Sequence, residues 1–158
     1  MDEAAKKEAL RLFTYGLYAV TTGTREDWSA FTANWCTQVS FEPPLVALSV
    51  ENDSHSLPII QASGRFVVNV FAADQRELSG ALGKPYRRHP EKTEGLAVTF
   101  TASGAPALTE TLAWVECEVE GSMPAGDSTL MLGRVVDAAV LRQGEPLTMR
   151  AAGFKHAG

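Results

Sequence analysis

The strongest constraint on the fold is an alternation of side chains between residues 113 and 120. Apolar positions alternate there with charged or aromatic ones, with a period of two. The apolar positions are Ala113, Val115, Cys117 and Val119, and the others are Trp114, Glu116, Glu118 and Glu120. Successive side chains of a β-strand point to opposite faces. The pattern therefore predicts a strand with one face on a core and its three glutamates in water.

Runs rich in β-branched and aromatic residues predict further strands. They cover residues 17–22 and 28–33, which form a hairpin around a turn at 23–27, and then residues 45–50, 65–72, 129–141 and the tail 146–154. "MPAGD" and "RQGEP" are predicted turns. Because the strands follow one another through short connections instead of alternating with helices, the sequence favours an antiparallel barrel over a βαβ sheet.

Three short helices are predicted between the strands. The first residues, up to about Tyr15, form an amphipathic helix, and residues 74–82 form another. Residues 56–63, "SLPIIQAS", form the third, with Ser56 as its N-cap and Gly64 at its end. A long loop, rich in proline and charge, is expected from Gly83 to Gly95.

Length and charge limit the class of protein. A chain of 158 residues, 45% hydrophobic, is expected to form a single domain over residues 1–158. A net charge of −5 opposes a general affinity for nucleic acid or anionic membranes. The apolar runs are too short to span a bilayer, and the N-terminus lacks a signal-peptide core, so we expect a cytoplasmic protein without a membrane partner.

Cysteines and histidines give no sign of a metal centre. The two cysteines, Cys36 and Cys117, form no CxxC pair, and this spacing predicts free thiols in a reducing compartment. The three histidines lie in three separate contexts. We therefore expect no metal site.

The segment "TANWCTQVSFEPP", residues 32–44, does not follow the alternation of a core strand. Small polar residues surround Trp35 and Cys36, and two prolines end the run. Packing alone does not explain this composition. The chain also has neither GxGxxG nor GxxxxGK[ST], so a nucleotide-like ligand would need its phosphate held by other means.

Five segments in order resemble the flavin reductase-like family of FMN-binding split-barrel proteins, which includes the small reductase components of two-component monooxygenases. They are "YGLYAVTT", "TANWCTQVSFEPPLVALSV", "GRFVVNVFAADQRELS", "GDSTLMLGRVVDA" and "GEPLTMRAAGF". The resemblance implies an antiparallel Greek-key barrel of about six strands, mainly β with a few short helices. It also implies a homodimer with FMN, or alternatively FAD, near the subunit interface.

The resemblance further implies which residues contact the flavin. These are Thr32, Ala33, Asn34, Trp35, Cys36, Thr37, Gln38, Ser40, Asn52, Ser54, His55, Ser56, Lys92 and Ser128. Trp35 beside small polar residues suits an isoalloxazine ring, which has apolar faces and a polar rim. Ser54 and Ser56, at the start of the predicted helix, suit the phosphate of FMN.

Each assignment has a plainer alternative. Trp35 would also serve as a core or interface aromatic, and Ser54 and Ser56 as ordinary helix caps. Cys36 is more simply a small buried residue than a redox group. Lys92 belongs to a basic cluster with Lys84, Arg87, Arg88 and His89, which is either a solvated surface or a clamp for flavin or dinucleotide phosphates.

Two positions depart from the family pattern. Ser128 stands where the family often has the histidine of Gly-Asp-His, and Phe154 stands where it often has tyrosine.

The resemblance implies an enzyme in which NADH or NADPH, as co-substrate, reduces the flavin, which then passes electrons to free flavin, oxygen or a partner oxygenase. No side chain is expected to act as an acid or base. The absent histidine keeps open a second hypothesis, an FMN-binding electron carrier with little nicotinamide activity, and a third is a barrel protein that no longer binds flavin.

Overall fold

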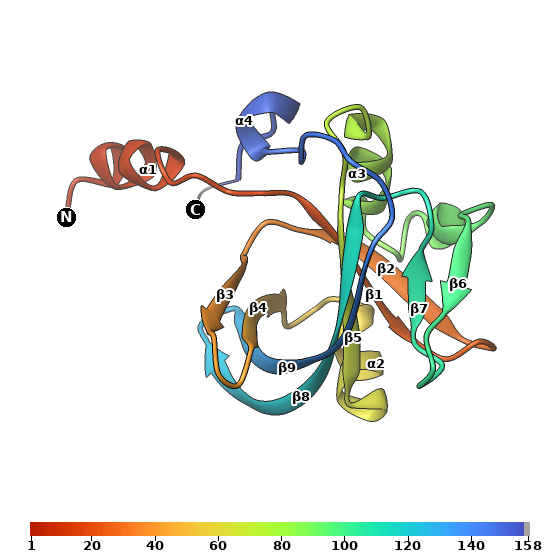
Figure 1. The fold of residues 1–158 in the computed structure, drawn as a ribbon. Coiled ribbons are helices and arrows are strands. Elements are labelled where there is room, and N and C mark those ends of the chain that lie inside the picture. Colours follow the sequence, from red (N-terminus) through yellow and green to blue (C-terminus); the bar gives the residue numbers. More distant parts are fainter. Residues whose placement is uncertain (157–158) are drawn as a thin grey trace.

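The computed structural model describes residues 1–156 (Figure 1), and its main element is a seven-stranded antiparallel sheet of order β2-β1-β5-β8-β9-β4-β3. The strands are β1 (Tyr18–Gly23), β2 (Trp28–Ala33), β3 (Cys36–Ser40), β4 (Leu45–Glu51), β5 (Arg65–Val70), β8 (Ala113–Ala125) and β9 (Ser128–Val140). A separate hairpin contains β6 (Val98–Phe100) and β7 (Pro106–Leu108). The predicted antiparallel arrangement is confirmed, with seven strands in the main sheet instead of about six.

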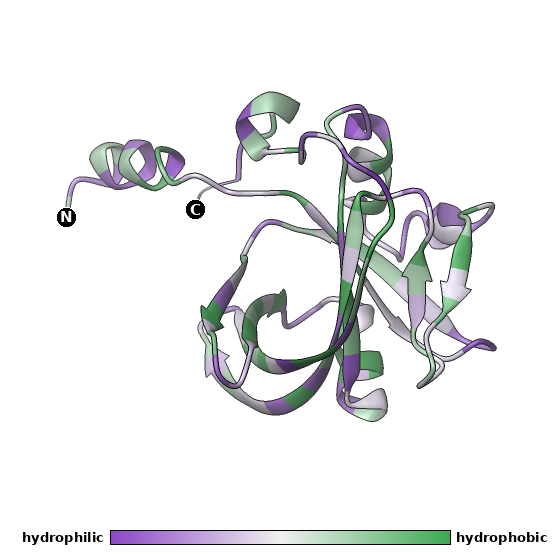
Figure 2. Ribbon diagram, viewed as in Figure 1, coloured by the Kyte–Doolittle hydropathy of each residue, from purple (hydrophilic) through white to green (hydrophobic). Residues whose placement is uncertain are grey.

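The sheet curls because its two longest strands bend. The register between β8 and β9 shifts twice, at Glu116/Cys117 and at Val119/Gly121, and such bulges increase local twist and bending. Figure 1 shows the curved part of the sheet formed by β8, β9, β4 and β3. Apolar side chains of β4, β5, β8 and β9 form one buried cluster with α2 (Ser56–Ser63), and Figure 2 shows hydrophobic and hydrophilic residues following each other along the curved strands.

Gly133 marks how tightly the curled sheet is packed. A Cβ atom at this position would lie 2.6 Å from Cζ of Phe66 and 2.7 Å from Cβ of Cys117, closer than real Cβ atoms approach. A glycine on β9 therefore lets β5 and β8 side chains meet inside the curl. Phe66 and Cys117 are both fully buried there.

The prediction of three solvated glutamates on β8 is wrong for Glu116. The β6–β7 hairpin covers this part of the outer face, where Trp114 packs with Ala105 and Ala107. Glu116 is 2% exposed and accepts hydrogen bonds from Arg65 Nη1, at 3.0 Å, and from the Ser103 hydroxyl. An ion pair and a hydroxyl thus satisfy a carboxylate that the alternation alone placed in water.

The helices are short. They are α1 (Glu3–Arg11), α2 (Ser56–Ser63), α3 (Arg76–Leu82), the 3₁₀ turn η1 (Pro90–Thr93) and α4 (Met149–Ala152). The prediction of Ser56 as an N-cap is wrong, because Ser56 is the first helical residue of α2 and His55 precedes it without a side-chain cap. Figure 1 shows α1 projecting away from the rest of the chain.

The predicted strand in the tail is also wrong, because residues 149–152 form α4. The Thr148 side chain caps this helix by accepting a bond from Ala151 N at 3.1 Å, and Gly153 ends it with φ of 72°. Only isolated bridges, Ala72 to Pro146 and Gly16 to Thr148, retain strand pairing in this region. The predicted turn at 123–127 is shorter than expected, since β8 continues through Ala125.

Over residues 1–156, no helix has the length and apolar character needed to cross a bilayer. The same residues contain no group of three or more histidine, cysteine or acidic side chains arranged to hold a metal ion.

Candidate functional site

A cavity of about 820 Å³ lies where four parts of the chain meet. Its walls come from the end of β2, from the loop between β4 and α2, from α3 with the loop after it, and from the C-terminal segment around α4. We call it the main cavity. These parts are distant in sequence, so the antiparallel sheet and its connections bring them together.

Trp35 contributes an aromatic ring to the wall of the main cavity. Its ring centroid lies 4.9 Å from that of His156, and both side chains line the cavity. A second cavity of about 410 Å³ shares Asn34, Trp35 and Ser49 with the first. A planar ring placed beside Trp35 would meet an aromatic surface with polar groups at its edge.

Two buried polar atoms among the described residues lack a hydrogen-bond partner, and both belong to residues that line the main cavity. They are Nδ2 of Asn34 and Oγ of Ser79. Thr32 adds a fixed polar group beside them, since its hydroxyl donates to the Ser79 carbonyl at 2.6 Å. Unsatisfied buried donors are rare in folded proteins, so these two residues are suited to a polar ligand edge.

The loop between β4 and α2 contributes Ser54 and His55 to the main cavity, and the first residue of α2 contributes Ser56. The Ser56 side chain is 2% exposed, and its hydroxyl lies 2.9 Å from that of Ser29. Oγ of Ser54 accepts a bond from Ser56 N at 3.3 Å. Both serine hydroxyls thus have partners within the protein, but that of Ser56 bonds to Ser29 and caps no helix. Both residues remain at the cavity wall.

Asn52, in this loop, and Ser128, the first residue of β9, line neither cavity. Asn52 fixes the loop to the β8–β9 turn, because its amide donates to the Gly126 carbonyl at 3.3 Å and accepts from the Thr129 hydroxyl at 2.8 Å. Ser128 is 2% exposed, and its hydroxyl donates to Oδ1 of Asp127 at 3.2 Å. These contacts give Asn52 a positioning role and leave Ser128 away from the cavity.

The remaining predicted contacts fall into three groups. Ala33 lines the main cavity, whereas Cys36 and Thr37 line only the second cavity. Gln38 and Ser40 lie toward the far end of β3, lining neither, with Nε2 of Gln38 donating to the Ser40 carbonyl at 3.1 Å. The structure thus brings the first half of the predicted segment to the cavities and carries its second half away.

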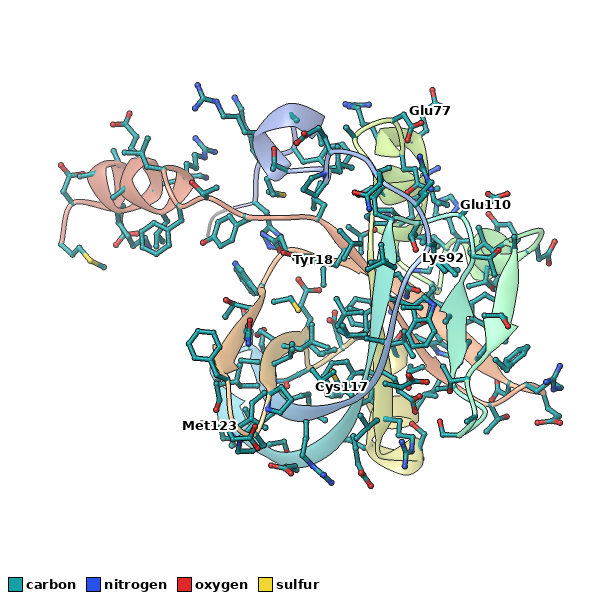
Figure 3. All side chains as sticks on the ribbon, viewed as in Figure 1. Tyr18, Glu77, Lys92, Glu110, Cys117 and Met123 are labelled. Carbon is teal, nitrogen blue, oxygen red and sulfur yellow. The ribbon has the colours of Figure 1, made fainter. Side chains whose placement is uncertain are left out.

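Lys92 reaches the main cavity from η1 (Figure 3 labels it). Its Nζ donates to the carbonyls of Leu82 and Lys84, each at 2.8 Å. These carbonyls lie at the end of α3, where a cation also compensates the helix dipole. Burial lowers the pKa of Lys92. The lysine therefore fixes the loop after α3, which places Lys84, Tyr86 and Arg87 on the cavity wall.

The thiols are poor nucleophiles. Burial raises the pKa of Cys36 to about 12, and burial together with nearby Cys36 and Glu116 raises that of Cys117 to about 12. Burial, followed by the charge of Cys36, also raises the pKa of Tyr18. A protonated thiol beside Trp35 agrees with the structural interpretation of Cys36.

Several cavity residues were missed by sequence reasoning. They are Ser79 and Gly80 on α3, Tyr86 in the following loop, and Met149, Phe154 and His156 near the C-terminus. The tail is held to α3 by Arg76, which donates from Nε to the Ala152 carbonyl at 2.6 Å and lies 5.0 Å above the Phe154 ring. Because the tail was predicted to be a strand, its residues were not expected in the cavity wall, and Phe154 was noted only as a departure from the family pattern.

Comparison with known proteins adds a separate line of support. Residues 10–158 match the family model described as "Flavin reductase like domain". The chain is 34% identical over 143 residues to high molecular weight rubredoxin of Moorella thermoacetica, covering 89% of this chain and 62% of that protein. It is 33% identical over 148 residues to "FMN reductase (NADH) SmoA" of Agrobacterium fabrum, covering 94% and 82%.

A solved structure agrees with the fold. Nitrilotriacetate monooxygenase component B from Mycobacterium thermoresistibile superposes with a TM-score of 0.84 at 28% identity, covering 93% of this chain and 82% of that one. This similarity confirms the mainly β split-barrel architecture expected from the sequence.

Proposed function

The chain belongs to the flavin reductase-like domain family, and from this membership we propose that it binds FMN in the main cavity and catalyses reduction of the flavin by NADH or NADPH. Family membership supports the reaction class. The observation that carries the assignment of the site is the pair of unpartnered buried groups, on Asn34 and Ser79, in a cavity with an aromatic wall at Trp35. FAD is the alternative flavin.

The residues present fit a bound flavin. Trp35 offers a flat apolar surface, and the Asn34 amide and Ser79 hydroxyl are available to the polar rim of the ring. Lys84, Arg87 and Lys92 place positive charge along the loop side of the cavity, where a phosphate would be favoured. Asn52 and Lys92 act on the site indirectly by fixing its two flanking loops.

A flavin held there would supply the electron chemistry, as acceptor of a hydride from the nicotinamide ring. The protein orients the two rings and limits access of water. The reduced flavin would pass its electrons to free flavin, oxygen or a partner oxygenase.

The assignment is tested by titrating the protein with FMN and comparing Asn34→Leu and Ser79→Ala with the parent. Each variant should bind FMN about tenfold more weakly, because one hydrogen bond to the ring edge is lost. The two variants should also bind lumiflavin, which lacks the phosphate, more weakly than the parent by the same factor. A parent that binds no flavin, or two variants that bind it as well as the parent, would refute the proposed site.

The electron-carrier alternative rested on Ser128 in place of the family histidine. Ser128 lines neither of the two cavities described above, and its hydroxyl is bonded to Asp127. The identity of this residue therefore gives no reason to favour the carrier over the reductase.

We also propose that two chains associate as a homodimer. Helix α1 buries none of its residues, and the adjacent Leu12 and Phe13 are 83% and 61% exposed. At the edge of the sheet, Val39 and Phe41 are 51% and 88% exposed. Exposed apolar side chains of this kind favour a protein interface. Light scattering should give twice the 17.0 kDa chain mass, and a mass of one chain at micromolar concentration would contradict this proposal.

A further inference from the structure

The C-terminal segment places an imidazole ring against Trp35. The ring centroids of Trp35 and His156 lie 4.9 Å apart, with an angle of 33° between the ring planes. Both residues line the main cavity, and His156 does not line the second one. The face of Trp35 that is turned toward His156 is therefore already covered by an aromatic ring.

A third ring does not fit between these two. A flat ring stacked between Trp35 and His156 would lie about 3.5 Å from each, so the two side chains would have to be about 7 Å apart. The observed centroid distance of 4.9 Å is shorter. A ligand ring that stacks on this face of Trp35 must therefore displace His156.

The tail is firmly attached as far as Phe154. Nε of Arg76 donates to the Ala152 carbonyl at 2.6 Å. The Phe154 amide donates to the Met149 carbonyl at 3.2 Å. The Phe154 ring also packs beside α3, since a Cβ atom at Gly80 would lie 3.5 Å from its Cζ. These contacts hold α4 and Phe154 in the cavity wall.

His156 is attached much more weakly than the residues before it. It is exposed, and over residues 1–156 neither His156 nor Lys155 makes a hydrogen bond or an ion pair. A single contact between two aromatic rings favours the paired arrangement by about two- to tenfold. A ligand with a larger ring system gains more from Trp35 than the imidazole does, because stacking grows with the area of contact.

We propose that His156 lowers the affinity of the main cavity for flavin by competing with the isoalloxazine ring for Trp35. The proposal rests on the proposed function, in which the flavin ring stacks on that tryptophan. In the ligand-free protein, His156 covers Trp35. On flavin binding, His156 gives up this place to the larger fused ring system, and residues 155–156 move while Phe154 stays in the cavity wall.

Titration of FMN fluorescence with protein measures the competition. His156→Ala removes the covering ring, so it should bind FMN about three- to tenfold more tightly than the parent. His156→Phe keeps a ring on Trp35 and should bind FMN no more tightly than the parent. Lys155→Ala is the matched control, since Lys155 adjoins His156, is exposed and lines neither cavity. Binding by His156→Ala that is no tighter than binding by Lys155→Ala would overturn the proposal.

Proton NMR of the histidine rings follows the displacement without turnover. The chain has three histidines, and the signal that is lost in His156→Ala is that of His156. Stacking on Trp35 should move this signal upfield from its position in the urea-unfolded protein, because an aromatic ring shields protons above its face. Saturating FMN should return the signal toward the unfolded position. A signal that is unshifted without ligand, or that keeps its full shift at saturating FMN, would contradict the displacement.

The outcomes separate this inference from the proposed function. If the parent binds and reduces FMN while the His156 signal keeps its shift, only this inference fails. If neither the parent nor His156→Ala binds FMN, the proposed function fails and the inference fails with it. If FMN binds and displaces His156 but stays oxidised with NADH and with NADPH, only the reductase assignment fails.

Discussion

Asn69 joins three parts of the fold through one buried side chain. Its Nδ2 donates to the Ala19 carbonyl at 2.9 Å and to the Thr21 hydroxyl at 3.0 Å, and its Oδ1 accepts from Leu108 N at 2.8 Å. The side chain is fully buried. β5 is thereby tied to β1 and to the β6–β7 hairpin.

Replacing Asn69 by alanine should lower the free energy of unfolding by about 3 kcal/mol, because buried backbone groups lose their partner. Urea denaturation measures the change. Gln143→Ala serves as the control, since Gln143 is exposed and its side chain makes no hydrogen bond within residues 1–156. A loss below about 1 kcal/mol for Asn69→Ala would show that water replaces these bonds.

The thiols should be nearly inert in the folded protein. Burial raises their pKa from the ordinary 9.0 to about 12, so the thiolate fraction at pH 8 falls about a thousandfold. Iodoacetamide labelling of the native protein at pH 8 should be slower than labelling in urea by about that factor. Because the folded pKa is raised, the associated stability is present below pH 9 and is lost as the pH rises toward 12. Labelling at similar rates in both states would contradict this account.

Sequence reasoning at the residue scale depended on unusual composition. The segment beginning at Thr32 was singled out because it broke the alternation, and Thr32 through Trp35 do line the main cavity. Ser79 could not be found in this way, since one serine inside a short helix has no distinguishing pattern. Ser128 was carried over from the family, and its burial beside Asp127 depends on tertiary packing.

Among the elements, the loop after α3 depends on a single side chain. The last carbonyls of a helix lack backbone partners within the helix. Nζ of Lys92 donates a hydrogen bond to one of them, the Leu82 carbonyl, and a second to the Lys84 carbonyl. The fixed loop then presents Tyr86 and Arg87 to the cavity. Lys92 therefore connects the end of a helix to the shape of the site.

Lys92→Met keeps most of the apolar stem but removes both hydrogen bonds, and we expect it to lower the free energy of unfolding by about 2 kcal/mol. FMN affinity should fall as well, because the loop loses its fixed shape. Lys84→Met is the matched control for stability, since only the backbone of Lys84 takes part in these bonds. Unfolding curves that coincide for Lys92→Met and the parent would rule out the anchoring role.

Element predictions were right where periodicity dominated and wrong where local capping or tertiary cover decided. The β1–β2 hairpin, β4, β5 and β9 follow from their apolar and β-branched runs. The tail became α4 because Thr148 and Gly153 cap a short helix, a local signal that outweighed the strand pattern. Glu116 was misplaced because a hairpin distant in sequence covers it.

At the scale of the whole molecule, the site forms only when distant segments of the chain come together in the fold. β2, the loop before α2, α3 and the C-terminal segment lie far apart in the sequence, and the curled sheet brings them around one cavity. The ordered set of five motifs predicted the family and the split barrel. It did not predict the closure of the cavity by the tail, because that closure rests on the contacts of Arg76 with Ala152 and Phe154.

The central claim is that this cavity holds a flavin which a nicotinamide nucleotide reduces. Anaerobic stopped-flow mixing of the FMN-loaded protein with NADH, and separately with NADPH, tests it most directly. We predict that at least one donor bleaches the oxidised flavin absorbance within seconds, and that Asn34→Leu reduces the amplitude at limiting FMN by releasing flavin from the protein. A parent that binds FMN but stays oxidised for minutes with both donors would contradict the reductase and favour the electron carrier.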